Sequence, residues 1–253
     1  MLAPQRQEKI LGLLEKHGTL RTVDLAESFE VTDETIRRDL IALADTGQLM
    51  KIHGGASSLS GKPKPQSFIE RSLINIDRKD AIARAALKLI KPGNTYAFDS
   101  STTAMSLVSK LPDLNLRVIS NAFSVFEQLG AKENIELIST GGQFHKKTRT
   151  FVNANLQQSV GRYHLNCALI SCIGFNFKSG AGEAFEAQTT YKEFVIHQAD
   201  QVVLLIDSSK FERQSDYYFA SANQIHRIIT DWKIDQQIAR RIQETGIELT
   251  IAE

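Results

Sequence analysis

The sequence predicts an α/β protein with two domains, an N-terminal winged helix-turn-helix domain and a larger C-terminal α/β domain. Three observations support this prediction. Capped segments with helical apolar spacing fill residues 5–46, a stretch rich in Ser, Gly, Pro and Lys follows at residues 57–67, and short apolar strands alternate with helices from residue 92 onward. A chain of 253 residues, of which 42% are hydrophobic, is long enough to bury two cores of unequal size.

Charge, cysteine content and apolar runs limit the classes of function. Thirty Lys and Arg residues face 29 Asp and Glu residues, so the net charge of +1 lacks the basic excess usual in nucleic-acid binders. Cys167 and Cys172 have no metal-ligand spacing around them, which suits a reducing cytoplasm. No apolar run approaches the roughly 20 residues of a membrane helix, and the first residues lack a signal-peptide core. We therefore expect a cytoplasmic protein with no membrane partner, no metal and no cofactor.

The N-terminal region predicts three short helices. Apolar residues recur at helical spacing in residues 5–16. Thr22 is expected to cap a second helix at residues 23–29, and Thr32 to cap a third from about residue 33 to residue 46. Residues 48–53 then alternate like a strand before Gly54-Gly55, which suits a hairpin tip. Three helices followed by a hairpin is the order of a winged helix-turn-helix.

The third helix has an apolar face and a polar face. Ile36, Leu40 and Leu43 share one side, and a rotation of about 100° per residue places Arg38 nearly opposite. Arg can bind guanine through two hydrogen bonds, and Thr can contact phosphate or a thymine methyl group. The alternative is an amphipathic helix with solvated charges, but the capped helix, turn and hairpin around it favour DNA. The predicted DNA-contacting residues are Arg6, Arg21, Thr32, Glu34, Thr35, Arg37, Arg38, Lys51 and His53.

The N-terminal segment resembles a known family of DNA-binding domains. Residues 5–56, including TIRRDL (residues 35–40) and HGGA (residues 53–56), are similar to the N-terminal domain of the DeoR family of bacterial sugar-metabolism regulators. Lys51 stands where Arg is commoner in that family, which keeps the charge but loses the forked geometry. Residues 1–56 hold seven Lys and Arg against nine Asp and Glu, so DNA affinity must depend on placed cations and on dimerisation.

A linker separates the two predicted domains. We place the winged helix-turn-helix at residues 1–56, the linker at residues 57–74 and the C-terminal domain at residues 75–253. A continuous helix is expected at residues 68–89. It carries Arg71, Arg78, Lys79 and Arg84, which lie either over flanking DNA phosphates or on a solvated face.

The C-terminal domain predicts a mostly parallel sheet covered by helices. The expected strands are residues 95–98, 116–120, 136–139, 167–171, 201–206, 227–230 and 248–251. The expected helices between them include residues 104–111, 122–129, 191–198 and 234–245. Ligands of such sheets bind at the carboxyl ends of the strands, so the residues that follow each strand are the candidate site.

Polar residues follow several of these strands. Hydroxyl groups at a helix start, glycines and basic side chains can bind a phosphate. The same residues can also serve as helix caps, turns and solvated loops, so each is weak evidence alone. Together they predict a site for a phosphorylated polyol. The candidate residues are Asp99, Ser100, Ser101, Thr102, Thr103, Asn121, Gly141, Gly142, Lys147, Thr150, Glu186, Lys192, Asp207 and Lys210.

This region also resembles the DeoR family, now in its effector-sensing domain. The family's D-x-G-T-T pattern falls on residues 99–103, T-N-S/A on residues 120–122, G-G on Gly141-Gly142, E-x5-K on Glu186 and Lys192, and D-S-S-K-F on residues 207–211. The resemblance implies a sensor domain related to ribose-5-phosphate isomerase and a phosphorylated-sugar effector. Ser101 replaces the usual glycine, so we expect less freedom for a positive φ there.

The leading functional hypothesis is a repressor of a carbohydrate-utilisation operon. Its operator affinity would be controlled by the phosphorylated sugar, and it would bind double-stranded operator DNA as a homodimer or homotetramer. A transcriptional activator with the same sensor is the first alternative. The second is a sugar-phosphate isomerase with an added N-terminal module, for which Glu186 or Asp99 would be the general base.

Overall fold

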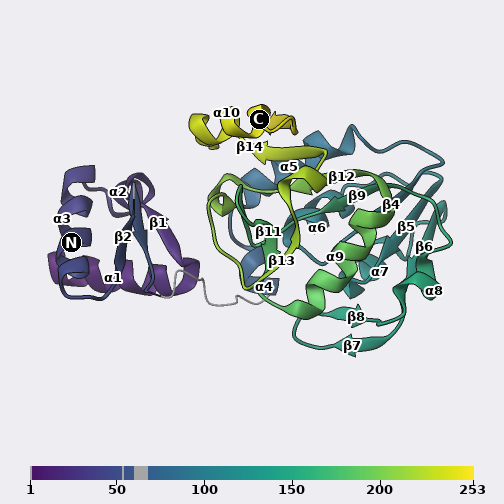
Figure 1. The fold of residues 1–253 in the computed structure, drawn as a ribbon, viewed down its shortest axis with the longest axis horizontal. Coiled ribbons are helices and arrows are strands. Elements are labelled where there is room, and N and C mark those ends of the chain that lie inside the picture. Colours follow the sequence, from purple (N-terminus) through teal and green to yellow (C-terminus); the bar gives the residue numbers. More distant parts are fainter. Residues whose placement is uncertain (1, 53, 60–67) are drawn as a thin grey trace. The chain divides into compact units, whose positions relative to one another are not determined.

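The protein consists of two compact units. The computed structural model describes residues 2–52, 54–59 and 68–253 (Figure 1). The chain divides between Gln66 and Ser67.

The N-terminal unit has the predicted winged helix-turn-helix order. It contains α1 (Ala3–His17), α2 (Thr22–Phe29), α3 (Asp33–Asp45), β1 (Thr19–Arg21), β2 (Met50–Ile52) and β3 (Gly55–Ser57). The three strands form an antiparallel sheet in the order β1-β3-β2. The predicted apolar faces of α1 and α3 meet in one core, which also includes Leu25 of α2. Strand β1 was not predicted, because three residues are too few to show an alternating pattern.

The start of α3 is fixed by its sequence. Glu30 has a left-handed conformation (φ 53°) that ends α2. Thr32 then caps α3 as predicted, since its hydroxyl accepts a hydrogen bond from the Thr35 backbone N–H at 3.3 Å. Thr22 differs from the prediction. It is the first residue of α2, and the cap position belongs to Arg21, whose side chain makes no capping hydrogen bond.

The C-terminal unit is built on a seven-stranded parallel sheet. Its strand order is β15-β14-β12-β9-β4-β5-β6, and every neighbouring pair is parallel. All of the predicted strands are in this sheet, with their ends shifted by at most two residues. The strands are β4 (Thr95–Phe98), β5 (Leu116–Ser120), β6 (Ile135–Ser139), β9 (Leu165–Ile170), β12 (Ala199–Leu205), β14 (Arg227–Asp231) and β15 (Glu248–Ala252).

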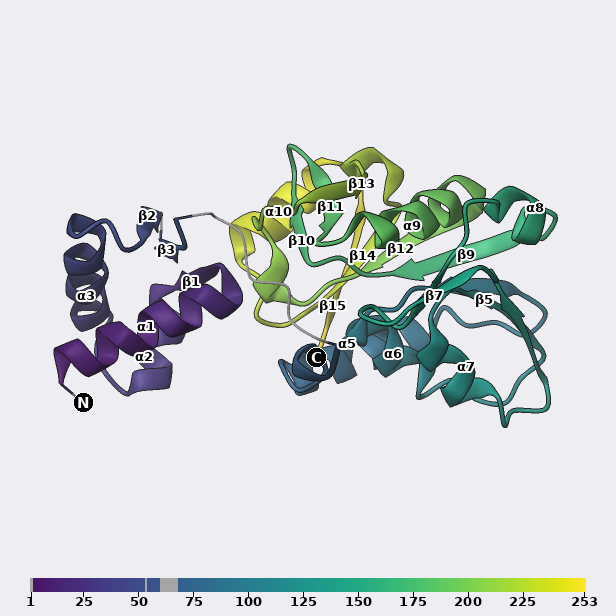
Figure 2. The same ribbon diagram turned by 90° about the horizontal axis from the view of Figure 1, so that it is seen from below.

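Helices cover both faces of the sheet (Figure 2). One face packs against α5 (Ile76–Leu87), α6 (Thr102–Val108) and α7 (Phe123–Leu129). The other packs against α9 (Glu186–Gln198) and α10 (Gln236–Glu244). Helix α9 begins five residues before its predicted start. Within the described residues, no helix has the length and apolar character that a membrane span requires.

Several short elements were not predicted. A small sheet holds β10 (Gly174–Asn176), β11 (Gly180–Glu183) and β13 (Tyr217–Ala220), and a hairpin joins β7 (Gln143–His145) to β8 (Thr150–Val152). The remaining elements are α8 (Leu156–Val160) and the 3-10 turns η1 (Ser208–Lys210) and η2 (Ala222–Gln224). Most of these segments are too short for their apolar pattern to show a period.

The expected continuous helix at residues 68–89 was wrong. Two helices occur there, α4 (Phe68–Ser72) and α5, and Asn75 between them has a left-handed backbone (φ 54°, ψ 40°). Asn tolerates this conformation better than most residues, so a helix can be interrupted without glycine. Helix α4 therefore belongs to the second unit, although we had assigned its residues to the linker.

A buried ion pair joins α1 to α3. The Arg6 Nε atom donates to Asp39 Oδ2 at 2.5 Å, and the two side chains are only 8% and 5% exposed. Gln7 also donates to the Asp39 carboxylate, at 3.1 Å. The prediction that Arg6 contacts DNA phosphate does not agree with this burial, because its guanidinium group is enclosed between two helices.

Removing one partner of this pair should destabilise the N-terminal unit. We expect Asp39→Ala to cost about 3–5 kcal/mol, because it leaves the Arg6 charge buried without its carboxylate. Asp24→Ala, which removes a half-exposed partner of Arg21, should cost about 1 kcal/mol or less. Hydrogen exchange of the α1 and α3 amides in increasing urea measures both effects. Equal losses in the two variants would contradict the assignment.

Candidate DNA-binding and ligand-binding sites

Helix α3 presents the predicted polar face. Arg37 and Arg38 are exposed, while Ile36, Leu40 and Leu43 are buried in the core of the unit. The Arg38 Nε atom lies 3.2 Å from Glu34 Oε1 in an ion pair whose side chains are 79% and 61% exposed. Such an exposed pair is weak, so the guanidinium group is available for another acceptor.

The other predicted DNA contacts differ in their accessibility. Lys51 is exposed on β2. Arg21 is half exposed and pairs with Asp24. The hydroxyl groups of Thr32 and Thr35 lie 2.9 Å apart at the exposed start of α3. His53 lies outside the described residues.

A buried lysine lies at the carboxyl ends of the central strands. Lys192 of α9 places its Nζ atom 2.7 Å from Asp99 Oδ2, directly after β4. The same ammonium group donates to the carboxylate of Glu183 on β11 and to the backbone carbonyl of Ser171, which follows β9. The Lys192 ammonium group therefore joins α9 to β11 and to the residues that follow β4 and β9.

The charges in this cluster stabilise one another. Burial alone would lower the pKa of Lys192, but the carboxylates of Asp99 and Glu183 outweigh it and raise the pKa. Burial acts to raise the pKa of Asp99, and the ammonium group of Lys192 overcomes this and lowers it. Lys192 is therefore a fixed cation with two anionic partners.

Of the two predicted ligand contacts in the E-x5-K pattern, Lys192 is buried and Glu186 is exposed at the first position of α9. The second carboxylate beside Lys192 comes from Glu183. Glu183 was missed because its side chain reaches Lys192 from the short strand β11, which no sequence pattern indicated. The nine-residue separation is not a spacing that brings two side chains together on one helix.

Three polar oxygens near these strand ends have no hydrogen-bond partner in the structure. They are Thr103 Oγ1, Asn121 Oδ1 and Glu183 Oε2, and all three are buried. Buried polar atoms nearly always have a partner, because leaving one unpaired is unfavourable. Two of these residues, Thr103 and Asn121, were predicted ligand contacts, and their free acceptors suit the hydroxyl groups of a polar ligand.

The start of α6 requires no positive φ at Ser101. The backbone there is extended (φ −74°, ψ 149°), so the residue does not need the freedom of glycine. Its hydroxyl donates to Asp99 Oδ1 at 2.6 Å and accepts from the Ala104 N–H at 3.1 Å, which caps α6. Ser100 and Thr102 are also buried in this turn, and Ser100 accepts a hydrogen bond from Gln188 at 3.2 Å.

Gly141 and Gly142 shape the turn that leads into the β7–β8 hairpin. Both have positive φ, and a Cβ atom on Gly142 would lie 2.3 Å from the Val152 carbonyl oxygen. Lys147 at the hairpin tip is exposed and lies 4.5 Å from the centre of the Phe185 ring. Thr150 is buried, and its hydroxyl lies 2.7 Å from that of Thr148. These contacts support the turn rather than direct ligand binding by the glycines.

A cavity of about 420 Å³ lies beside this hairpin, next to the segment that follows β5. Its lining is mostly aromatic, and consists of Phe123, Phe144, Lys146, Arg149 and Phe151.

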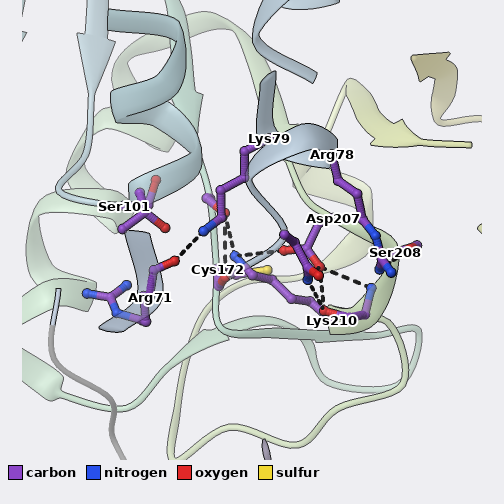
Figure 3. A network of polar contacts seen from close by, with 12 residues as sticks. Arg71, Arg78, Lys79, Ser101, Cys172, Asp207, Ser208 and Lys210 are labelled. Atoms are coloured by element: carbon purple, nitrogen blue, oxygen red, sulfur yellow. Dashed lines mark hydrogen bonds and ion pairs between the residues drawn. The ribbon is translucent and has the colours of Figure 1, made fainter. Parts of the chain in front are cut away.

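A second charged cluster lies at the carboxyl end of β12 (Figure 3). Asp207 is buried, and three cations surround it. Lys210 Nζ lies 3.7 Å from Asp207 Oδ2 and 3.3 Å from the Ser171 hydroxyl. Lys79 of α5 is 4% exposed and donates to the backbone carbonyl of Arg71. We call Lys79, Lys210 and Arg213 the cation cluster.

The cation cluster carries more positive than negative charge. Burial, followed by repulsion from Lys210, lowers the pKa of Lys79 to about 8. Burial also lowers the pKa of Arg213, although the attraction of Asp207 opposes this. The sequence predicted Asp207 and Lys210 as site residues and did not indicate Arg213, which comes from the loop before β13. The prediction that Lys79 of α5 lies over DNA phosphates or on a solvated face was wrong, because its side chain is buried. Three cations beside one carboxylate favour the binding of an anion.

Among the described residues, no group of three or more His, Cys, Asp or Glu is arranged to hold a metal ion. Cys167 and Cys172 are both free and buried, and burial raises the pKa of each thiol to about 12.

Comparison with known proteins identifies both units. The DeoR-like helix-turn-helix domain matches residues 6–62, and the DeoR C-terminal sensor domain matches residues 74–232. The chain belongs to the DeoR family. Its members among the curated relatives are transcriptional regulators, so this chain is a DeoR-type transcriptional regulator that carries a helix-turn-helix DNA-binding domain and a sensor domain.

The relatives include both activators and repressors. The chain is 36% identical to the uncharacterised HTH-type transcriptional regulator YulB of Bacillus subtilis, over 99% of this chain and 97% of that protein. It is 33% identical to the L-fucose operon activator of Escherichia coli, over 92% and 96% of the two chains. It is 30% identical to the HTH-type transcriptional repressor GlcR of B. subtilis, over 100% and 98%.

Solved structures overlap with part of the chain. The match to ribose 5-phosphate isomerase A from Methanocaldococcus jannaschii covers 54% of this chain and 55% of the isomerase chain. The two are 19% identical, with a TM-score of 0.42. The eIF2B delta subunit of Chaetomium thermophilum covers 78% of this chain, with 62% of that chain matched, at 11% identity and a TM-score of 0.46.

The pKa of Lys79 predicts how anion binding changes with pH. Raising the pH through about 8 should neutralise Lys79, and sulfate affinity should fall by about tenfold or more, the value of one charge-assisted hydrogen bond. Lys210, Asp207 and Arg71 are the charged residues whose fields act on Lys79. Sulfate stays doubly charged throughout, so the protein alone titrates. Calorimetric titration across this pH range measures the change.

Two variants serve as controls for the pH effect. Lys79→Met should bind sulfate weakly with little pH dependence over the same range. Lys88→Met, which removes an exposed cation at the end of the same helix, should behave like the parent protein. A pH dependence that persists unchanged in Lys79→Met would contradict the assignment.

Proposed function

We propose that the protein is a cytoplasmic repressor of a carbohydrate-utilisation operon and that a phosphorylated sugar controls its operator affinity. The observation that carries the proposal is the cation cluster, which lies at the same sheet edge as the unpartnered oxygens of Thr103, Asn121 and Glu183. Cations suit the phosphate of such a ligand, and the oxygens suit its hydroxyl groups. The ligand contacts proposed from the sequence are retained, except Glu186 and the two turn glycines, Gly141 and Gly142.

The exposed face of α3 supports the proposed DNA contacts. We propose that Arg37 and Arg38 read base edges and that Lys51 contacts phosphate, because all three are exposed, whereas Arg6 is withdrawn from the proposed contacts because it is buried. One recognition helix contacts a short half-site, so we propose that the protein binds paired half-sites as a homodimer or homotetramer.

Induction sets a thermodynamic requirement. The sugar phosphate must bind more tightly to the protein state with lower operator affinity, because a ligand shifts an equilibrium only by its differential affinity for the two states. An activator of the same construction is the second candidate, and the similarity to the L-fucose operon activator favours it.

The contacts of the carboxylates argue against the isomerase alternative. Asp99 is held by Lys192, Ser101 and the Ser171 N–H, and its pKa is lowered. Glu186, the other predicted base, is exposed at the start of α9. A general base needs a pKa near the working pH, which the lowered pKa of Asp99 does not provide. Glu186 is not among the described residues that contact the buried Lys192.

Binding of a sugar phosphate should raise the melting temperature. A ligand at about 100 times its Kd stabilises the folded state by about 2.7 kcal/mol. A thermal-shift screen of sugar phosphates should therefore find a concentration-dependent shift, and the corresponding unphosphorylated sugars should give none. Lys210→Ala should lose most of the shift, whereas Lys88→Met should retain it. No shift with any member of a broad panel would contradict the proposed effector class.

Truncation of the recognition helix should weaken operator binding selectively. We expect Arg38→Ala to cost about 1–3 kcal/mol in operator affinity, because it removes a base contact, while the sugar-phosphate affinity stays unchanged. Gel-shift titration on DNA selected from a random library measures the change. Arg240→Ala, an exposed change on α10, is the matched control. An unchanged operator affinity in Arg38→Ala would show that the recognition face is assigned wrongly.

A further inference from the structure

Helix α4 packs against α6 and is also held by polar contacts to the C-terminal unit. It has no fully buried residue, and Ile69 within it is 70% exposed. Leu73, directly after the helix, is 69% exposed. Because none of its residues is fully buried, hydrogen bonds to the rest of the unit also help to fix its position.

The first of these contacts runs through Asn75, between α4 and α5. Its left-handed backbone turns the chain, and its side-chain Nδ2 donates to Asp207 Oδ1 at 3.1 Å and to the Ser209 hydroxyl at 3.2 Å. Arg78 makes a parallel contact, donating to the Ser208 hydroxyl at 3.2 Å. The turn between the two helices is thus bound to the loop that carries Asp207.

The second contact runs through Lys79. Its ammonium group donates to the backbone carbonyl of Arg71, so α5 holds the C-terminal turn of α4 (Figure 3). Lys79 is also a member of the cation cluster, close enough to Lys210 and Asp207 for their charges to act on it. Lys79 therefore restrains α4 and would also be attracted to an anion bound at the cation cluster.

We propose that α4 and Asn75 form a latch that opens when an anion binds at the cation cluster. This inference rests on the proposed function and names how occupancy of that site is transmitted. An anionic oxygen is a stronger acceptor for Lys79 than a backbone carbonyl. Lys79 turns toward the anion, the Arg71 carbonyl loses its donor, and α4 is released.

The position of α4 in the sequence gives the latch its role. It is the first described element after residues 60–67, which connect it to the DNA-binding unit. Release of α4 therefore changes how firmly the chain that leads to the DNA-binding unit is held by the C-terminal unit. In this proposal α4 has two arrangements, latched and released. Anion binding at the cation cluster favours the released arrangement, and α4 thereby links the cluster to the DNA-binding unit.

The test is hydrogen–deuterium exchange of the full chain, with inorganic phosphate as the probe. In the parent protein, phosphate should increase the exchange of the amides in residues 68–74 by about tenfold, the effect of losing one charge-assisted hydrogen bond on local opening. The amides of residues 207–213 should exchange more slowly, because they are beside the bound anion.

Asn75→Gly separates the latch from ligand binding. Glycine keeps the left-handed backbone but removes the amide that binds Asp207. In this variant, the amides of residues 68–74 should exchange fast without phosphate, and phosphate should change their exchange little. Phosphate affinity should stay within about threefold of the parent value, a smaller change than the loss of one neutral hydrogen bond would cause. Lys88→Met, on the exposed end of α5, should respond like the parent protein.

The outcomes distinguish the latch from the proposed function. Protection at residues 207–213 without any change in residues 68–74 would overturn the latch and leave the ligand site intact. A phosphate response of residues 68–74 that is the same in Asn75→Gly would also overturn it. If neither phosphate nor any sugar phosphate changes exchange or melting temperature, the proposed effector site fails, and the latch fails with it.

Discussion

The ion cluster of Lys192, Asp99 and Glu183 is the interaction on which the sensor unit depends. A buried ammonium group is strongly unfavourable unless carboxylates and hydrogen-bond acceptors compensate it. Asp99 and Glu183 supply this compensation, and the Ser171 carbonyl adds a further contact. The cluster fixes the carboxyl ends of β4 and β9 against α9 and β11. It also pairs the carboxylates of Asp99 and Glu183 with Lys192, whereas Asp207 is the carboxylate that acts on Lys79 and Arg213.

The near-neutral charge of the whole chain conceals this local arrangement. A net charge of +1 does not predict either an operator or a phosphate ligand. The structure instead concentrates cations at particular places, with Arg37 and Arg38 on the exposed face of α3 and Lys79, Lys210 and Arg213 around Asp207. Arg6 in the N-terminal unit differs from these cations, because its charge is buried and pairs α1 with α3 through Asp39. Placement and burial decide what each charge does.

The sequence predicted the elements that have a clear period or cap. The strands of the main sheet, the Thr32 cap and the apolar back of α3 follow from local patterns. The prediction failed where a side chain acts through a distant segment. The pairing of Arg6 with Asp39, and of Lys192 with Glu183 rather than Glu186, depends on tertiary packing that spacing does not reveal. The break at Asn75 was missed because no Gly or Pro marks it, and the contact of Asn75 with Asp207 comes from a distant segment that sequence spacing does not reveal.

Coupling between the two units is the central claim, and a titration of sugar phosphate into the protein–operator complex measures it most directly. Fluorescence anisotropy of labelled operator DNA should show that a saturating sugar phosphate weakens binding by about 5- to 150-fold. By linkage, operator DNA should weaken binding of the sugar phosphate by the same factor. A sugar phosphate that binds the protein tightly and leaves operator affinity unchanged would contradict the claim.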